Sequence, residues 1–336
     1  MKVRNPRSYV IIFIYVCLNL VVVLMAFNQK VQEANRKGTP APLAPEYTRI
    51  EELKYFHLKS SVPQMSLNAS SMRSQGEELA EFQNPEGLYN FKEQNKTLVY
   101  RAQEGVYRKS KELLVLTGDV NLSNAEAEYL AQKIKYFFKK DLVLASGGVH
   151  FEGNDPKTKD HLEIDAESMR AKPHLKKMNF KGGVKGSLQR KKKYEGKMTF
   201  SSQQLEFDGL KSLVNLEGAV TLRRQSYLIT AGKADIFLEN FNKSLKYFVF
   251  NDDVKVTETI EGPQGTTYRK AFSERLEGYG REEKMVLSGA PRVENGEDVV
   301  KGYRITIREK MELIEVDDAM SDVKVRKDAN KKKLKD

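Results

Sequence analysis

The feature that most constrains this fold is a run of alternating apolar and polar residues centred on a glycine. One copy reads Leu114, Leu116, Gly118, Val120 and Leu122. Residues two apart lie on the same face of a strand, so each copy predicts a strand with one apolar face and one solvent-exposed face. The glycine marks a bend or bulge, where a side chain would clash or a positive φ is needed.

This run recurs along most of the chain. In the four clearest copies an alanine or serine precedes the glycine by 16 residues and the next valine by 18. The copies pair Ala102 with Gly118, Ala131 with Gly147, Ala166 with Gly182, Ser202 with Gly218, Ala231 with Asp252, Ala271 with Gly289, Gly302 with Asp318 and, weakly, Ala69 with Pro85. We therefore predict an all-β chain: about eight units, each of two bent antiparallel strands, stacked into an elongated open jellyroll or solenoid-like sheet pair. Small residues at recurring inner positions indicate space inside, and a filled core is the alternative.

A single transmembrane helix is predicted ahead of the repeats. Residues 9–27 are 19 residues without a charge, and a helix of that length spans roughly 28 Å, close to the hydrocarbon thickness of a bilayer. A cleaved signal peptide is the alternative, but the apolar run is longer than usual and no small-x-small site follows it. Because Lys2, Arg4 and Arg7 precede the run, we expect a cytoplasmic N-terminus and a β-domain on the far side of an inner membrane.

Charge and motif content exclude several function classes. The net charge of +11 is concentrated in residues 2–7, 185–197 and 324–335, without any nucleic-acid-binding signature, so anionic lipid or a polyanionic glycolipid is the better partner; solvated charge is the alternative for the last two clusters. Cys17 is the single cysteine, which excludes an intrachain disulfide. The four histidines lack metal-ligand spacing, and no nucleophile elbow or phosphate loop occurs. We predict no enzyme activity, no catalytic residues, no metal and no cofactor.

With these residues in view, the chain resembles the periplasmic lipopolysaccharide-transport proteins LptC and LptA, which share an OstA-like β-jellyroll. The first half is similar to LptC through SLNASSMRS, TLVYRAQEGVYRKSKELLVLTGDV and the anchor. The second half is similar to LptA through MTFSSQQLEFDGLKSLVNLEGAVTLRRQSYLITAGKADIFLE and LEGYGREEKMVLSGAPRVENGEDVVKGYRITI. Each of those proteins is about one such domain, whereas this chain carries both in tandem. We expect a cytoplasmic tip and anchor over residues 1–28, a proline-containing tether over 29–48, an LptC-like jellyroll over 49–188, an LptA-like jellyroll over 189–325 and a basic tail over 326–336.

The resemblance implies a periplasmic bridge that accepts lipopolysaccharide from an inner-membrane ABC transporter and conducts it in an apolar groove toward the outer membrane. The implied partners are lipopolysaccharide, the transporter subunits, and an outer-membrane lipopolysaccharide assembly protein or a further LptA-like protein. A membrane-anchored structural or adhesive β-solenoid without lipid cargo is the alternative.

Two sets of residues are candidates for this function. The predicted lipid-groove lining consists of the inward positions Leu114, Leu116, Val120, Val149, Phe180, Val184, Leu216, Val220, Phe248, Phe250 and Val254. The N-terminal end, near residues 66–91, is expected to face the transporter. The C-terminal end, near residues 299–316, is expected to be a free docking edge whose apolar face carries Ile305, Ile307, Ile314 and Val316.

Overall fold

The computed structural model describes residues 47–322, except 60–61, 77, 92–95, 126, 141, 155–158, 173–174, 191–195, 240–243, 263–264, 280–281, 283 and 309–312. Within these residues no helix is both long enough and apolar enough to cross a membrane. The predicted anchor over residues 9–27 and the basic tail lie outside the described residues.

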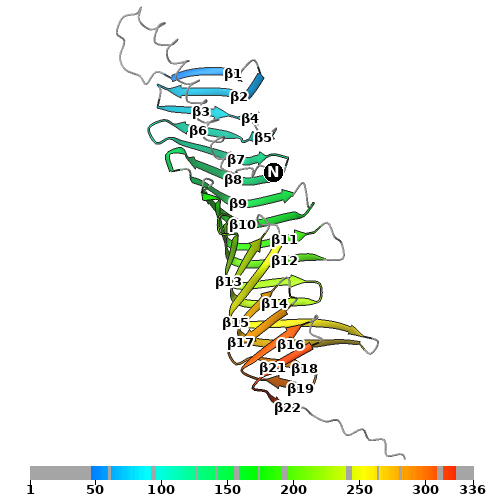
Figure 1. Cartoon of the computed structure of the whole chain (residues 1–336). Coiled ribbons are helices and arrows are strands. Elements are labelled where there is room, and N and C mark those ends of the chain that lie inside the picture. Colours follow the sequence, from blue (N-terminus) through cyan, green and yellow to red (C-terminus); the bar gives the residue numbers. More distant parts are fainter. Residues whose placement is uncertain are drawn as a thin grey trace, which may run out of the picture. The chain divides into compact units, whose positions relative to one another are not determined.

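The described residues form 22 strands and one short 3₁₀ helix (Figure 1). All the strand pairs reported below are antiparallel, and the prediction of an all-β fold is confirmed. The elements are β1 (Tyr47–Lys59), β2 (Val62–Gln75), β3 (Leu79–Gln83), β4 (Glu86–Phe91), β5 (Lys96–Arg101), β6 (Glu104–Arg108), β7 (Leu113–Ser123), β8 (Ala127–Phe137), η1 (Phe138–Lys140), β9 (Leu142–Asn154), β10 (His161–Lys172), β11 (Lys177–Gln189), β12 (Lys197–Asp208), β13 (Leu213–Arg224), β14 (Tyr227–Glu239), β15 (Ser244–Gly262), β16 (Gly265–Tyr279), β17 (Lys284–Ser288), β18 (Arg292–Asn295), β19 (Asp298–Lys301), β20 (Arg304–Arg308), β21 (Leu313–Asp317) and β22 (Met320–Asp322).

The chain divides into two compact units, the first ending at Leu216 and the second beginning at Glu217. This division falls inside β13. The domain boundary expected between residues 188 and 189 stays a prediction.

In the first unit, the strands follow one another as antiparallel neighbours from β7 to β12. At its N-terminal end, single long strands pair with two short ones. The half of β2 around residues 65–68 pairs with β4, and the half around residues 71–75 pairs with β3. In the same way, β7 pairs with β6 and then with β5. Each long strand therefore contributes one half to each of two walls.

The walls meet where each long strand bends. In β9 the bend consists of two consecutive glycines with positive φ, Gly147 at 85° and Gly148 at 81°, and the register with β10 shifts there. In β15 the same place is taken by Asp252 at 69° and Asp253 at 54°. Further bends with consecutive positive φ values are at Gly118-Asp119, Gly182-Gly183, Gly218-Ala219 and Gly289-Ala290. A pair of left-handed residues makes a bulge that bends the strand, so the bend predicted at the repeated glycine is confirmed.

Close approach of the neighbouring strand explains why the first bend residue is usually glycine. A Cβ atom on Gly147 would lie 2.6 Å from Cβ of Gln132, which is closer than real Cβ atoms approach. In the copy that has Asp252 in place of glycine, the facing residue is Gly232, and a Cβ on Gly232 would lie 2.8 Å from Cβ of Asp252. Each facing pair has room for a single Cβ, and the glycine can sit on either strand.

The second unit continues the pattern and ends with a different topology. β14, β15 and β16 pair in order. β16 then divides its length, because residues 275–279 pair with β17 and residues 269–272 pair with β18. One wall continues from β17 to β20 and β21, and the other from β18 to β19 and β22.

Candidate functional site

The inner face has a fully buried floor along the line of bends. On either side of the bend in β11, Phe180 and Val184 are both 0% exposed. In the second unit Phe250 and Val254, which flank the bend in β15, are each 1% exposed. These side chains close the corner between the walls, and burial of each large apolar side chain stabilises the fold by roughly 1.5–3 kcal/mol.

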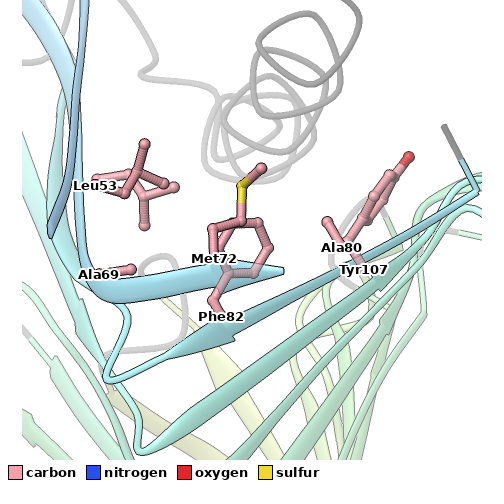
Figure 2. Close-up of a cluster of buried hydrophobic side chains, with 7 residues drawn as sticks. Leu53, Ala69, Met72, Ala80, Phe82 and Tyr107 are labelled. Carbon is pink, nitrogen blue, oxygen red and sulfur yellow. The ribbon is translucent and has the colours of Figure 1, made fainter. Parts of the chain in front are cut away.

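The floor at the N-terminal end of the first unit is a cluster drawn from both walls. Figure 2 shows Leu53 and Ala69 beside one another, Met72 above Phe82, and Ala80 next to Tyr107. The cluster gathers side chains from β1, β2, β3 and β6 on one side of their ribbons. The partly buried residues packed against it are Ile50, Tyr55, Tyr100 and Leu114.

Exposure of the inner residues increases with distance from the bend. In β11, Val184 is fully buried, whereas Leu188, four residues further along the same face, is half-buried. Leu188 lies opposite Leu162 of β10 and Met198 of β12, which are also half-buried. The inner-face rows that lie farthest from the bend therefore expose apolar surface above the buried floor. An apolar ligand requires such a surface.

Aromatic rings lying on glycines line part of this surface. Phe248 is directly opposite Gly278, and Phe200 is directly opposite Gly186. A Cβ atom on either glycine would overlap the ring of its partner. The missing side chain lets each ring lie against the neighbouring backbone, so the inner face there is formed by the ring.

Burial also affects a titratable group on the inner face, the hydroxyl of Tyr129 in β8. Tyr129 packs its ring against Phe151 at a centroid separation of 4.9 Å. Burial disfavours the phenolate form and raises the pKa of Tyr129 to about 12. A charged ligand group would meet the same penalty there, whereas an acyl chain would not.

The outer face of β10 and β11 carries a polar cluster that is joined by hydrogen bonds. Nε2 of His161 lies 2.9 Å from the Glu163 carboxylate, and the hydroxyl of Ser187 donates to that carboxylate at 2.7 Å. The hydrogen bonds from His161 and Ser187 lower the pKa of Glu163 to about 2. The two faces thus differ in chemistry as the alternation predicts.

The predicted lining residues fall into two groups of exposure. Leu114 and Phe248 are half-buried. The other nine are buried and belong to the floor: Leu116, Val120, Val149, Phe180, Val184, Leu216, Val220, Phe250 and Val254. That any of them contacts lipid stays a prediction.

The predicted docking residues lie on two different strands. Ile305 and Ile307 are 0% and 2% exposed and belong to β20, which pairs with β17 on one side and with β21 on the other. The structure therefore places them one strand further in than the expected free edge. Ile314 and Val316 are half-buried on β21, whose pairing among the described residues is with β20.

The predicted lining left out the inner-face residues that lie farther from the bend, although several of them, such as Leu122, belong to the alternating runs recognised in the sequence. They include Leu122, Val143, Leu162, Met178, Leu188, Met198 and Phe200, which are all half-buried. The sequence feature that identifies them is the same alternation of apolar and polar residues, continued away from the bend. Met198 and Phe200 belong to the strand that precedes the glycine-containing strand of their repeat.

Two protein-family models match successive parts of the chain. Residues 14–189 match the family described as lipopolysaccharide-assembly, LptC-related. Residues 199–312 match the family described as LptA/(LptD N-terminal domain) LPS transport protein. No curated protein matches the chain in sequence. Among solved structures, LptH, the LptA homologous periplasmic component of the lipopolysaccharide transport device from Pseudomonas aeruginosa, matches with a TM-score of 0.34 and 10% identity, over 38% of this chain and 95% of that one.

The order of the two matches confirms the tandem arrangement that the resemblance implied. Both families serve lipopolysaccharide transport rather than catalysis, so the prediction that the chain is not an enzyme is also confirmed. Because the first match spans more than half of the 336 residues, the chain belongs to the lipopolysaccharide-assembly, LptC-related family, with an LptA-like domain following in the same polypeptide.

Proposed function

We propose that this chain is a periplasmic bridge component that accepts lipopolysaccharide from an inner-membrane ABC transporter and conducts it along its apolar inner face toward the outer membrane. The observation that carries the proposal is the layered inner face, which has a closed floor at the bends and half-buried apolar rows such as Leu162, Leu188 and Met198 above it. Membership of the LptC-related family and the match of residues 199–312 to an LPS transport family support the cargo.

The free energy of moving an acyl chain from the bilayer to the inner face is expected to be close to zero, so the chain is not held too tightly to move on. Burial of a CH₂ group is worth about 0.8 kcal/mol, so an acyl chain of about a dozen carbons gains on the order of 9 kcal/mol on the inner face. Extraction from the bilayer costs nearly the same, which leaves the transfer close to neutral. Direction must then come from an ATP-driven transporter, which we place beneath an anchor at residues 9–27 with the N-terminus in the cytoplasm.

The amount of lipid bound to the purified protein distinguishes a lipid conduit from the alternative, a structural or adhesive protein without cargo. We expect the chain lacking residues 1–28, purified from lipopolysaccharide-producing cells, to carry or take up acylated lipid, measured by native mass spectrometry. A domain that remains lipid-free after incubation with lipopolysaccharide micelles would favour the structural alternative.

The ends of each wall are the proposed docking surfaces. At the N-terminal end, β1 pairs with β2 among the described residues, and we propose that this edge faces the transporter. At the C-terminal end, we propose that β21 adds a strand from a jellyroll of an outer-membrane lipopolysaccharide assembly protein or of a further LptA-like protein. Unpaired strand edges recruit other chains in this way.

Proline substitutions at two neighbouring positions of β21 test the C-terminal edge. Alternate residues of an antiparallel edge strand direct their N–H groups toward and away from the sheet. Of Ile314→Pro and Glu315→Pro, one therefore removes an outward N–H and the other a bond to β20. We expect one variant to lose co-purification with the outer-membrane partner at an unchanged melting temperature. If both variants keep the partner, docking at this edge is wrong.

A further inference from the structure

A row of polar side chains crosses the inner face of the second unit. Tyr227 of β14 lies opposite Glu258 of β15, Glu258 lies opposite Arg269 of β16, and Arg269 lies opposite Asn295 of β18. This row is two positions further from the bend than an entirely apolar one, so both rows lie on the same face. The apolar row consists of Ile229, Val256, Ala271 and Val293, which are all at most 7% exposed.

The charges in this row are held in a buried setting. Glu258 is 8% exposed, and its Oε2 atom lies 3.6 Å from a terminal nitrogen of Arg269, which is too long for a hydrogen bond. Among the described residues, neither this Oε2 atom nor the buried hydroxyl of Tyr227 has a hydrogen-bond partner. Burial, together with the nearby Glu258 carboxylate, raises the pKa of Tyr227. Glu258 thus interacts with both Arg269 and Tyr227, but its Oε2 atom and the Tyr227 hydroxyl lack a hydrogen bond of good geometry, a desolvation cost that an external polar group would offset.

The corresponding row of the first unit is apolar. Gly153, Leu162, Leu188 and Met198 occupy successive strands there, again two positions beyond the row that follows the bend. Charge at this level of the inner face is therefore a property of the second unit and not a requirement of the fold.

The polar row lies at the rim of the inner face. The pairing of β14 with β15 ends at Glu258, and that of β18 with β16 ends at Arg269. Beyond them β15 and β16 continue as a two-stranded hairpin (Figure 1), in which Tyr268 is 55% exposed. From the floor residue Val254, Glu258 is four residues along the strand, or about 14 Å. Apolar wall thus separates the floor from the polar rim.

We infer that Tyr227, Glu258 and Arg269 form a binding site for the sugar end of a glycolipid whose acyl chains lie on the apolar rows below. This inference rests on the proposed function and names the part of the cargo that the second unit recognises. Sugar hydroxyl and amide groups both donate and accept hydrogen bonds, so they match an acceptor at Glu258 and donors at Tyr227 and Arg269. A fully ionised phosphate accepts only, so Arg269 suits it but the Glu258 carboxylate repels it.

Binding of two acylated ligands by the full chain in mild detergent tests the site. Lipid A, an acylated and phosphorylated disaccharide, is compared with cardiolipin, which has four acyl chains and two phosphates but no sugar. The test variant is Glu258→Gln with Arg269→Gln. Its matched control is Arg275→Gln with Glu277→Gln, which removes an ion pair of 2.7 Å on the outer face of the same strand, β16.

We expect the test variant to bind lipid A about tenfold more weakly, because two charged hydrogen-bonding groups are lost, and to bind cardiolipin as the wild type does. The control variant is expected to bind both ligands normally. Unchanged lipid A affinity, or an equal loss for both ligands, would overturn the sugar site. A wild type that binds neither ligand would instead refute the proposed function itself.

A charge exchange separates ligand binding from a structural role of the pair. Glu258→Arg with Arg269→Glu keeps an ion pair across β15 and β16 but moves the acceptor to the other strand. We expect this variant to recover the melting temperature of the wild type while lipid A affinity stays reduced. Full recovery of lipid A affinity would mean that the pair only shapes the sheet, which would overturn the inference.

Discussion

Gly147→Ala is expected to lower the free energy of unfolding by about 3 kcal/mol, and Gly148→Ala by about 1 kcal/mol. Both glycines have nearly the same positive φ, 85° and 81°. The cost of holding an alanine in this backbone conformation is therefore about equal in the two variants. A Cβ on Gly147 would lie 2.6 Å from Cβ of Gln132, whereas a Cβ on Gly148 would have nothing within 4 Å. Urea unfolding of the two variants measures the difference.

At Asp252 the glycine of the facing pair lies on the neighbouring strand, as Gly232, and this native arrangement suggests a second substitution that should restore stability to Gly147→Ala. Adding Gln132→Gly to Gly147→Ala recreates that arrangement, with the single Cβ on the other strand. We expect the double variant to recover the part of the loss that is due to the clash. Equal costs for Gly147→Ala and Gly148→Ala, or no rescue, would show that close strand approach does not select glycine here.

Ile305→Pro is expected to unfold the C-terminal wall of the second unit. Ile305 is fully buried on β20, and β20 pairs on both sides, so proline removes a ladder hydrogen bond as well as a packed side chain. The cost should be about 3 kcal/mol or more. Hydrogen exchange should show loss of protection in β17, β20 and β21 and retained protection in β7 to β12.

A conservative change at the same site is the control. Ile305→Val keeps the ladder and should cost about 0.5–1.5 kcal/mol, with protection retained throughout. If Ile305→Pro instead lost a binding partner while β17 stayed protected, β20 would behave as the free edge that the sequence analysis expected.

The strands and their bends were predictable because local chemistry determines them. Alternation identifies the inner face, and a glycine such as Gly147 is needed wherever a positive φ and a close neighbour coincide. The aspartate at 252 was also recognisable as a bend residue, but its physical reason was not. That reason is Gly232 on the neighbouring strand, which only the register reveals.

The C-terminal edge could not be predicted because its pairing is not sequential. β17 pairs with β20 across the intervening β18 and β19, so Ile305 enters the middle of a wall. Alternation shows which face a residue occupies, but it does not show which strands flank it. The same limit applies to depth: Leu116 and Leu188 share the inner face, yet one lies in the floor and the other near the rim.

Photo-cross-linking in lipopolysaccharide-producing cells tests the central claim most directly. A photoreactive amino acid is placed singly at Leu114 and Phe248, which are half-buried on the inner face, and at Lys211 and Arg223, which are exposed. Immunoblotting for lipopolysaccharide adducts is the readout. We predict adducts at Leu114 and Phe248 and none at Lys211 and Arg223. Equal labelling at all four positions, or none at the inner pair, would contradict a lipid path along the inner face.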